Sequence, residues 1–230
     1  MKKKPIIYCA ALLGTLLVSA PQATRANDDN PLRDAGFELQ LATDQGGWNL
    51  FDNSSFSTDE ARSGGQSMFN WGFSRTVAYP PYFIGTASGS YQEFPAGPGS
   101  RWRLTGFGVT PTTLEGAPAF GIVQVSFFDA LGNDLGTVET SGSNTPRAKT
   151  SNEVNNLTPA GEWTFLDTGI ATAPADTAIV QAFTLYVDFS GSNTSQGVYF
   201  DDLSLCALDD DEDDEVACKD FENDMEEDVD

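Results

Sequence analysis

The stretch IVQAFTLYVD, residues 179–188, decides the class of fold. Apolar and polar side chains alternate along it, and a period of two is typical of a β-strand with one face against a core. The face that we expect to be buried carries Ile179, Phe183, Leu185 and Val187. The other face, expected to be polar with one aromatic ring, carries Ala182, Thr184, Tyr186 and Asp188.

The same alternation recurs through the body of the chain. In one further segment Val123, Val125 and Phe127 alternate with Gln124, Ser126 and Phe128. Clusters of Gly, Pro, Asn and Ser separate the strand-like runs, as tight turns require. We expect strands at residues 90–94, 101–109, 121–128, 163–170, 179–187 and 197–205, with weaker ones at 37–42, 46–52 and 67–75. The sequence therefore predicts an all-β fold, a sandwich of two antiparallel sheets.

The amino terminus has the features of an export signal. Three lysines at positions 2–4 precede an apolar run over residues 6–20, and a small-residue site ends at Ala26. This is the pattern of a secretory signal peptide, and the run is shorter than the roughly 20 residues that cross a bilayer. We expect residues 1–26 to be removed and the protein to be secreted, extracellular or periplasmic, without membrane insertion.

Charge divides the rest of the chain into a body, residues 27–207, and an acidic tail, residues 208–230. The chain has 12 basic and 34 acidic residues, and 14 of the acids lie between positions 209 and 230. Mutual repulsion predicts a disordered tail. Such a tail keeps the protein soluble; loose binding of cations or docking on a basic partner are the alternatives. An anionic body disfavours nucleic acid, whose binding depends on Lys and Arg.

Catalytic patterns are missing from the sequence. The chain has no histidine, which excludes Ser-His-Asp triads and the usual zinc sites. A carboxylate pair of the glycosidase type stays open, with Glu93, Glu115, Glu162 and Asp188 as available acids. Any acidic protein offers such pairs by chance, so we expect a protein that is not an enzyme.

Two cysteines remain once the leader is removed. Cys206 and Cys218 are close in sequence, and exported proteins commonly pair such thiols. A disulfide here would pin the root of the tail; two free thiols are the alternative.

Five short segments follow one another in a family-like order. They are NPLRDAGFE (30–38) with Gly47-Trp48, ARSGGQS (61–67), YQEF (91–94) with PGSRW (98–102), GEW (161–163) with APA (173–175), and VYFDDLSL (198–205). Together they resemble the carbohydrate-binding modules of families 4, 9 and 22, which share a jelly-roll sandwich with the galactose-binding-like domains. The resemblance implies a jelly roll that binds polysaccharide or a surface glycan without catalysis. A cell-surface or matrix assembly protein on the same sandwich is the alternative.

Acids near both ends of the body suggest a cation site. An early acid and an acid pair on the final strand can converge where first and last strands meet, and Ca²⁺ takes several oxygen ligands. The resemblance implies a structural calcium held by the Glu38 and Asp201 side chains with main-chain oxygens of Gly36 and Gly65. In a regular strand Asp202 would point to the other face.

Sugar rings stack on exposed aromatic side chains, so such residues are the candidates for glycan binding. The segment 70–84, interrupted by two prolines, contributes Trp71, Tyr79, Tyr82 and Phe83. The outer face of the sheet contributes Gln124, Phe128 and Tyr186. For Trp71 a place in the core, alternating with Phe69 and Phe73, is the alternative.

Overall fold

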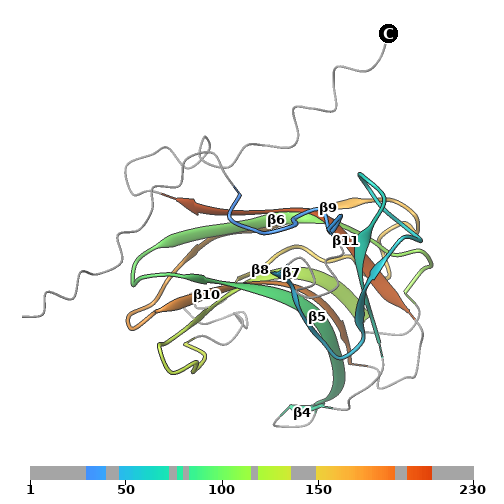
Figure 1. Ribbon diagram of the computed structural model, residues 1–230. Coiled ribbons are helices and arrows are strands. Elements are labelled where there is room, and N and C mark those ends of the chain that lie inside the picture. The colour runs from blue at the N-terminus through green and yellow to red at the C-terminus, as the bar shows by residue number, and fades with distance from the viewer. Residues whose placement is uncertain are drawn as a thin grey trace, which may run out of the picture.

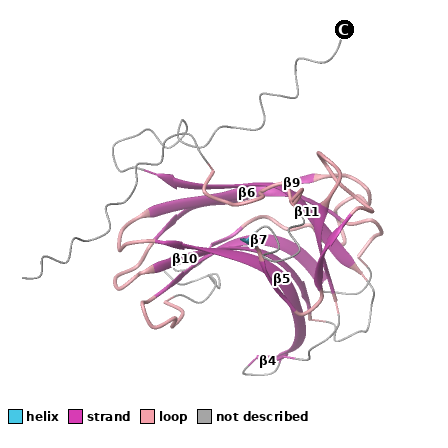
Figure 2. Cartoon of the chain, in the orientation of Figure 1, coloured by secondary structure: helices cyan, strands magenta, loops and turns pink. Residues whose placement is uncertain are grey.

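The computed structural model of the chain is a sandwich of two antiparallel sheets (Figures 1 and 2). It describes residues 30–39, 47–72, 77–79, 83–114, 119–135, 149–189 and 196–208. The β10 sheet runs in the order β1 (Asn49–Phe51), β5 (Phe83–Pro95), β10 (Ile179–Asp188), β7 (Ala119–Phe128), β8 (Lys149–Thr150), and β4 (Val77–Tyr79) pairs with β5. The β11 sheet runs in the order β2 (Ser54–Ser57), β3 (Ser67–Trp71), β11 (Gly197–Leu208), β6 (Arg101–Val109), β9 (Thr164–Thr172).

The chain crosses repeatedly between the sheets. From β5 to β7, and again from β9 to β11, each strand lies in the sheet opposite to its predecessor. This alternation is the jelly-roll arrangement, so the predicted fold class is confirmed. Of the predicted tail, only Leu208 is described, as the last residue of β11; residues 209–230 and the leader lie outside the described residues.

One predicted strand, residues 37–42, begins instead with a tight turn. Asp34 and Phe37 have φ angles of 50° and 59°, in the left-handed region. The Phe37 side chain is fully buried and packs on Trp48, with ring centroids 4.9 Å apart. Phe37, the first residue of the predicted strand, therefore belongs to a turn that carries its ring into the core, and residues 40–42 lie outside the described residues.

The face predicted for β10 is wrong: the strand is turned the other way. Val180, Ala182, Thr184 and Tyr186 are 0 % exposed, whereas the odd-numbered side chains that we expected in the core are half-buried on the outer face. β7 agrees with its prediction, since Val123, Val125 and Phe127 are all 0 % exposed. Register explains the difference: Thr184 lies opposite Val123 and therefore shares its inward face.

Hydrogen bonds between the sheets make the inward polar residues tolerable. Asn70 of β3 donates through Nδ2 to Thr184 Oγ1 at 2.8 Å, and the Ser90 hydroxyl lies 2.8 Å from the same oxygen. All three side chains are 0 % exposed. A buried hydroxyl that is hydrogen-bonded avoids the free-energy cost of burying an unpaired polar group. These hydrogen bonds join residues far apart in sequence, so the alternation of apolar and polar residues does not predict them.

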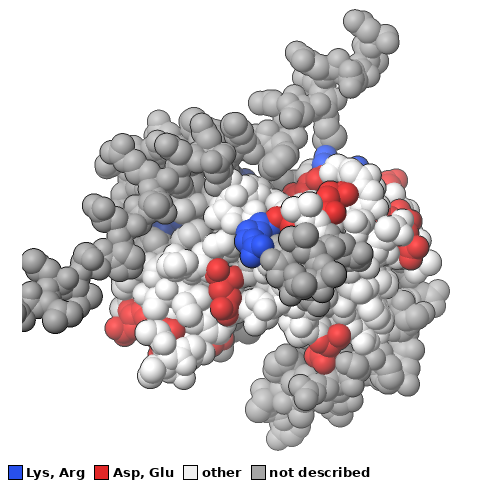
Figure 3. All heavy atoms as spheres, viewed as in Figure 1, with Lys and Arg blue, Asp and Glu red and all other residues white. Residues whose placement is uncertain are grey.

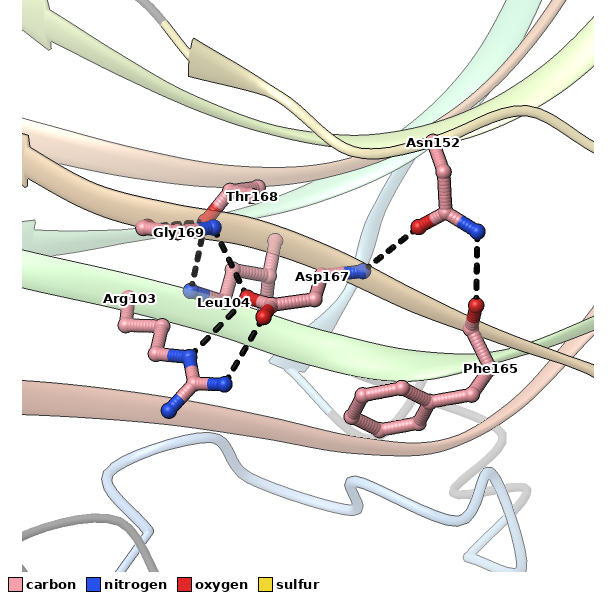
Figure 4. A network of polar contacts seen from close by, with 7 residues as sticks. All are labelled: Arg103, Leu104, Asn152, Phe165, Asp167, Thr168 and Gly169. Carbon is pink, nitrogen blue, oxygen red and sulfur yellow. Dashed lines mark hydrogen bonds and ion pairs between the residues drawn. The ribbon is translucent and has the colours of Figure 1, made fainter. Parts of the chain in front are cut away.

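A β-bulge in the edge strand β9 is held by polar contacts (Figure 4). Thr168 Oγ1 accepts the Leu104 N–H, while Arg103 forms a two-pronged ion pair with Asp167 at 2.9 and 2.7 Å. Burial raises the pKa of Asp167, but hydrogen bonds from Arg103 and the Gly169 N–H bring it below its usual value. Asn152 bonds the main chain of β9 from the outside, which blocks edge pairing there.

Truncating the two aromatic residues of β10 tests the inverted face. Tyr186→Ala should lower the free energy of unfolding by about 3–5 kcal/mol, as for other fully buried aromatic side chains. Phe183→Ala should cost less than about 2 kcal/mol, because its ring is half-buried. Urea unfolding of both variants measures this, and an equal or larger loss for Phe183→Ala contradicts the inward orientation of Tyr186.

Candidate functional site

The outer face of the β10 sheet carries one row of side chains across the strands. Direct register pairs link Asn49 to Tyr91, Tyr91 to Phe183, Phe183 to Gln124, and Gln124 to Thr150. Cross-strand neighbours on one face lie close together. These five residues, here called the transverse row, therefore form a continuous line over β1, β5, β10, β7 and β8. Figure 1 shows β5 bent along its length, with its concave side turned away from the β11 sheet.

Aromatic rings make up the centre of the transverse row. The ring centroids of Tyr91 and Phe183 are 5.3 Å apart, and Phe51 lies 6.4 Å from Tyr91. All three side chains are half-buried, so part of each ring faces solvent. Flat apolar rings on an open sheet face offer a surface on which another flat molecule can stack.

Amide and carboxylate groups flank the rings on one side. Gln181 Nε2 donates to Glu93 Oε1 at 2.5 Å, and Gln124 Nε2 donates to Ser126 Oγ at 2.7 Å. These contacts hold Gln124, in the row, and Gln181 and Glu93, beside it, in place. Rings beside oriented polar groups are the combination that a polar, flat-faced ligand needs.

The sequence-predicted aromatic residues do not gather at one place. Gln124 and Phe128 lie half-buried on the outer face of β7, as expected. Tyr186 is 0 % exposed on the inner face, so its assignment to a binding surface is contradicted. Trp71 lies in the other sheet, with its ring stacked on Phe69 at 5.1 Å.

The remaining predicted aromatics cannot be placed. Tyr79 belongs to β4 and Phe83 begins β5, but their side chains, like the whole of Tyr82, lie outside the described residues. Two residues of the transverse row, Tyr91 and Phe183, were missed by the sequence prediction. Their only sequence signal is an aromatic at alternate positions of a strand, which a core residue gives equally well.

The predicted convergence of early and late acids is present. A Cβ built on Gly36 would lie 3.8 Å from Asp201 Oδ1, 3.8 Å from Asp202 Oδ1 and 4.0 Å from Glu38 Cγ. Asn30 joins the two ends of the body, since its side chain bonds the main chain of Leu203 at 2.6 Å. The amino-terminal turn thus sits directly on β11.

A break in β11 brings both acids of the pair to the same side. The register with β6 shifts between Asp201 and Ser204, and Asp202 has a φ of 48°. In a regular strand Asp202 would point to the face opposite that of Asp201. Because of the break, both side chains lie on the same side. Asp202 pairs with Arg62 at 2.6 Å, and the Arg62 guanidinium carbon lies 3.5 Å above the Phe107 ring centre.

Asp201 is fully buried and is satisfied by main-chain groups. Its carboxylate accepts the N–H groups of Arg62, Ser63 and Asp202 at 2.8, 3.2 and 2.8 Å. Burial raises the pKa of Asp201 to about 6, and the Asp202 charge adds to this, while the N–H donors lower it. The folded protein thus holds a carboxyl group that resists ionisation.

Glu38 is the exposed member of this cluster. One oxygen of its carboxylate accepts the N–H groups of Gly65 and Gln66, at 2.9 and 3.1 Å. Gly64 is favoured here by its φ of 60°, in the left-handed region, and a Cβ there would also displace the Glu38 carboxylate, whose nearer oxygen would lie 2.1 Å away. The turn at 64–65 is therefore held against Glu38.

The side chains that could serve as metal ligands at this cluster suit calcium only in part. Their donor atoms are all oxygens, and a cation would neutralise the buried Asp201. Within the described ranges, however, no three Asp, Glu, His or Cys side chains are grouped as metal ligands. Glu38 and Asp201 would hold the ion only with main-chain carbonyls such as those of Gly36 and Gly65.

Cys206 is disulfide-bonded. It lies opposite Arg103 of β6, and its sulfur is 3.9 Å from the Ser204 hydroxyl. The predicted partner Cys218 is outside the described residues. In the part of the chain that can be described, no helix has the length and apolar character to cross a membrane.

Comparison with known proteins finds likeness in three-dimensional structure only. No family model matches the chain, and no curated protein does. Tailspike protein 4 of bacteriophage CBA120 shares 12 % identity with a TM-score of 0.48, over 78 % of this chain and 21 % of that one. A family 61 carbohydrate-binding module in complex with β-1,4-galactotriose shares 14 % identity with a TM-score of 0.45, over 78 % and 99 %.

Xylan-binding modules are also among the similar structures. The family 22 module and catalytic module of Clostridium thermocellum xylanase 10B, in complex with xylohexaose, share 16 % identity with a TM-score of 0.49, over 80 % of this chain and 29 % of that one. The chain thus spans about a fifth of the solved tailspike domain and less than a third of the solved xylanase modules. The likeness concerns the fold alone.

The raised pKa of Asp201 predicts a pH dependence of stability once divalent cations are chelated. Because the folded state favours the protonated form, this contribution is fully present below pH 3.8 and is lost as pH rises through about 6. The loss is at most about 3 kcal/mol. Urea unfolding of wild type and Asp201→Asn between pH 3 and 8 measures it by difference.

Asp167→Asn is the matched control with the opposite sign. Its lowered pKa means that the stabilisation from Asp167 is present above pH 3.8 and is lost as pH falls. A difference between wild type and Asp201→Asn that does not change with pH contradicts the assignment.

Proposed function

We propose that this protein is a non-catalytic carbohydrate-binding protein that holds a neutral glycan chain along the transverse row. The observation that carries the proposal is the line from Asn49 to Thr150, with the stacked Tyr91 and Phe183 at its centre. Sugar rings present C–H faces to aromatic rings and hydroxyls to amides. The resemblance of the sequence to carbohydrate-binding modules supports the same reading.

The charge of the face favours a neutral ligand. Glu93 is the only charged side chain among those that the register of β1, β5, β7 and β10 places there. Acidic side chains are spread over the visible surface and basic ones are few (Figure 3). A uronic or sulfated glycan would meet repulsion from Glu93 and no basic partner among the side chains that these four strands place on this face.

Export and the lack of catalysis belong to the same proposal. The leader-like residues 1–26 support secretion, and the absence of histidine from the sequence supports a binding role. An assembly protein built on the same sandwich is the competing function. Binding of cations or a basic partner by the tail remains a prediction, because residues 209–230 lie outside those described.

Glycan binding should depend on the rings of the transverse row. Against xylan, β-glucan, galactan and polygalacturonate in affinity electrophoresis, we expect retardation by at least one neutral polysaccharide. Tyr91→Ala and Phe183→Ala should each weaken this binding at least about tenfold, because the stacking surface is lost. Circular dichroism and the urea midpoint check that both variants are folded.

Trp71→Ala is the matched control, because its ring lies in the opposite sheet. It should leave the retardation unchanged. The proposal fails if no neutral polysaccharide is bound, or if Trp71→Ala abolishes binding while Tyr91→Ala does not. Absence of binding together with self-association would favour the assembly function.

A structural calcium at the junction of the two ends of the body is the second part of the proposal. The buried carboxylate of Asp201, which has no cationic side chain among its printed hydrogen-bond partners and lies beside Glu38, supports it. A bound cation there would tie the amino-terminal turn to β11. It has no part in contacting the glycan.

Removal of calcium should therefore lower the thermal unfolding midpoint at pH 7.5. A ligand that binds only the folded state stabilises it, by about 3 kcal/mol at a hundredfold excess over its dissociation constant. Glu38→Gln should abolish the sensitivity to chelation, while Glu93→Gln should retain it. An unchanged midpoint of the wild type after exhaustive chelation rejects the calcium site.

A further inference from the structure

The outer face of the β10 sheet has two chemically different halves on either side of the transverse row. Towards one end the adjoining row is polar and consists of Glu93, Gln181 and Ser126, which occupy consecutive strands in register. Beyond this polar row lie Pro95, Ile179 and Phe128, so on this side one polar row separates the nearest apolar side chains from the transverse row. Towards the other end two successive rows are apolar. The apolar half consists of Phe51, Leu185 and Ile122 in the nearer row, and Val187 and Phe120 in the farther one.

The apolar half is continuous from β1 to β7. Gly89 lies between Phe51 and Leu185, and a Cβ there would stand 2.8 Å from Phe51 Cζ and 2.9 Å from Leu185 Cδ2. The two side chains therefore reach over the glycine towards each other. Ile122 follows directly opposite Leu185 and is 5 % exposed.

The side chains of this half are not sealed in the core. Phe51, Leu185, Val187 and Phe120 are half-buried, as are the rings of the transverse row. Phe120 also has the ring of Phe189 at 6.0 Å, which extends the apolar surface beyond the end of β10. An apolar surface that borders a row of aromatic rings and amide groups suits a ligand that has both a sugar part and an apolar part.

We infer that the ligand is an amphipathic glycoconjugate: a neutral glycan that carries an acyl, alkyl or aryl group, which lies on the apolar half. This deepens the proposed function and rests on it. The glycan part stacks on Tyr91 and Phe183, and the apolar group leaves the sugar on the side away from Glu93. The ring centroids of Phe51, in the apolar half, and Tyr91, in the transverse row, are 6.4 Å apart, so the two parts of the site adjoin.

The curvature of the sheet favours such a substituent over a second copy of the chain. The concave side of β5 faces outward (Figure 1). Two concave surfaces related by a two-fold axis meet only at their rims and leave their centres apart. A narrow apolar group attached to a sugar can reach the centre of this concave face.

Matched pairs of glycosides test the inference. Isothermal titration compares methyl and octyl β-xylobioside, β-cellobioside and β-galactobioside, all below their micelle concentrations. For the disaccharide that binds best, the octyl form should bind the wild type at least about tenfold more tightly, because several CH₂ groups leave water. Leu185→Ser and Val187→Ser should each reduce this preference several-fold and leave the methyl glycoside affinity unchanged.

Gln181→Ala serves as the contrasting variant, since it belongs to the polar half. It should weaken both glycosides alike and preserve the octyl preference. Equal affinity of the wild type for methyl and octyl forms overturns the inference while leaving the proposed function intact. An octyl preference that survives both serine variants also overturns it, because the chain then binds elsewhere.

Two further outcomes would show that the proposed function itself is wrong or that the apolar half is covered by a second copy of the chain. If neither the glycosides nor the polysaccharides bind, the proposed function fails and the inference with it. If sedimentation shows a wild-type dimer that Leu185→Ser dissociates, the apolar half belongs to a second copy and the inference is overturned.

Discussion

The two-sided pairing of β10 is the constraint on which the rest of the structure depends. All ten residues of the strand are in register with β5 on one side and β7 on the other. Side chains alternate along a strand, so the choice of inward face for β10 also decides the faces of its two neighbours. With Thr184 and Tyr186 inward, Phe183 is left to line the open surface beside Tyr91.

Polar groups inside the sandwich make this orientation stable. Thr184 is accepted in the core because Asn70 and Ser90 reach it from the facing sheet and from β5. A hydrogen-bonded hydroxyl in the interior costs far less than an unpaired one. The same contact ties β3 to β10, so it fixes how the sheets lie on one another as well as which face of β10 is buried.

The two ends of the body meet at an irregular point of β11. The pairing of β11 with β6 shifts register after Asp201, so β11 is not a regular strand there. At this irregular point the amino-terminal turn contacts the main chain of β11. The main-chain oxygen of Ala35 accepts the Leu203 N–H at 3.0 Å. The strand thus gives up its regularity where it holds an acidic cluster, as bulges do near functional positions.

The sequence by itself determined the all-β class, most of the strands and the meeting of the two ends of the body. The strand predicted at 101–109 has the observed bounds of β6. These features depend on local alternation, turn residues and short motifs, which are written in consecutive positions. Only the tertiary structure decided which face of β10 is buried, because both of its faces carry apolar side chains. It also decided the place of Trp71 and the orientation of Asp202, since register with distant strands sets both, and register is not encoded in any one segment. The turn at Phe37 depends likewise on a distant contact, because its ring is buried against Trp48.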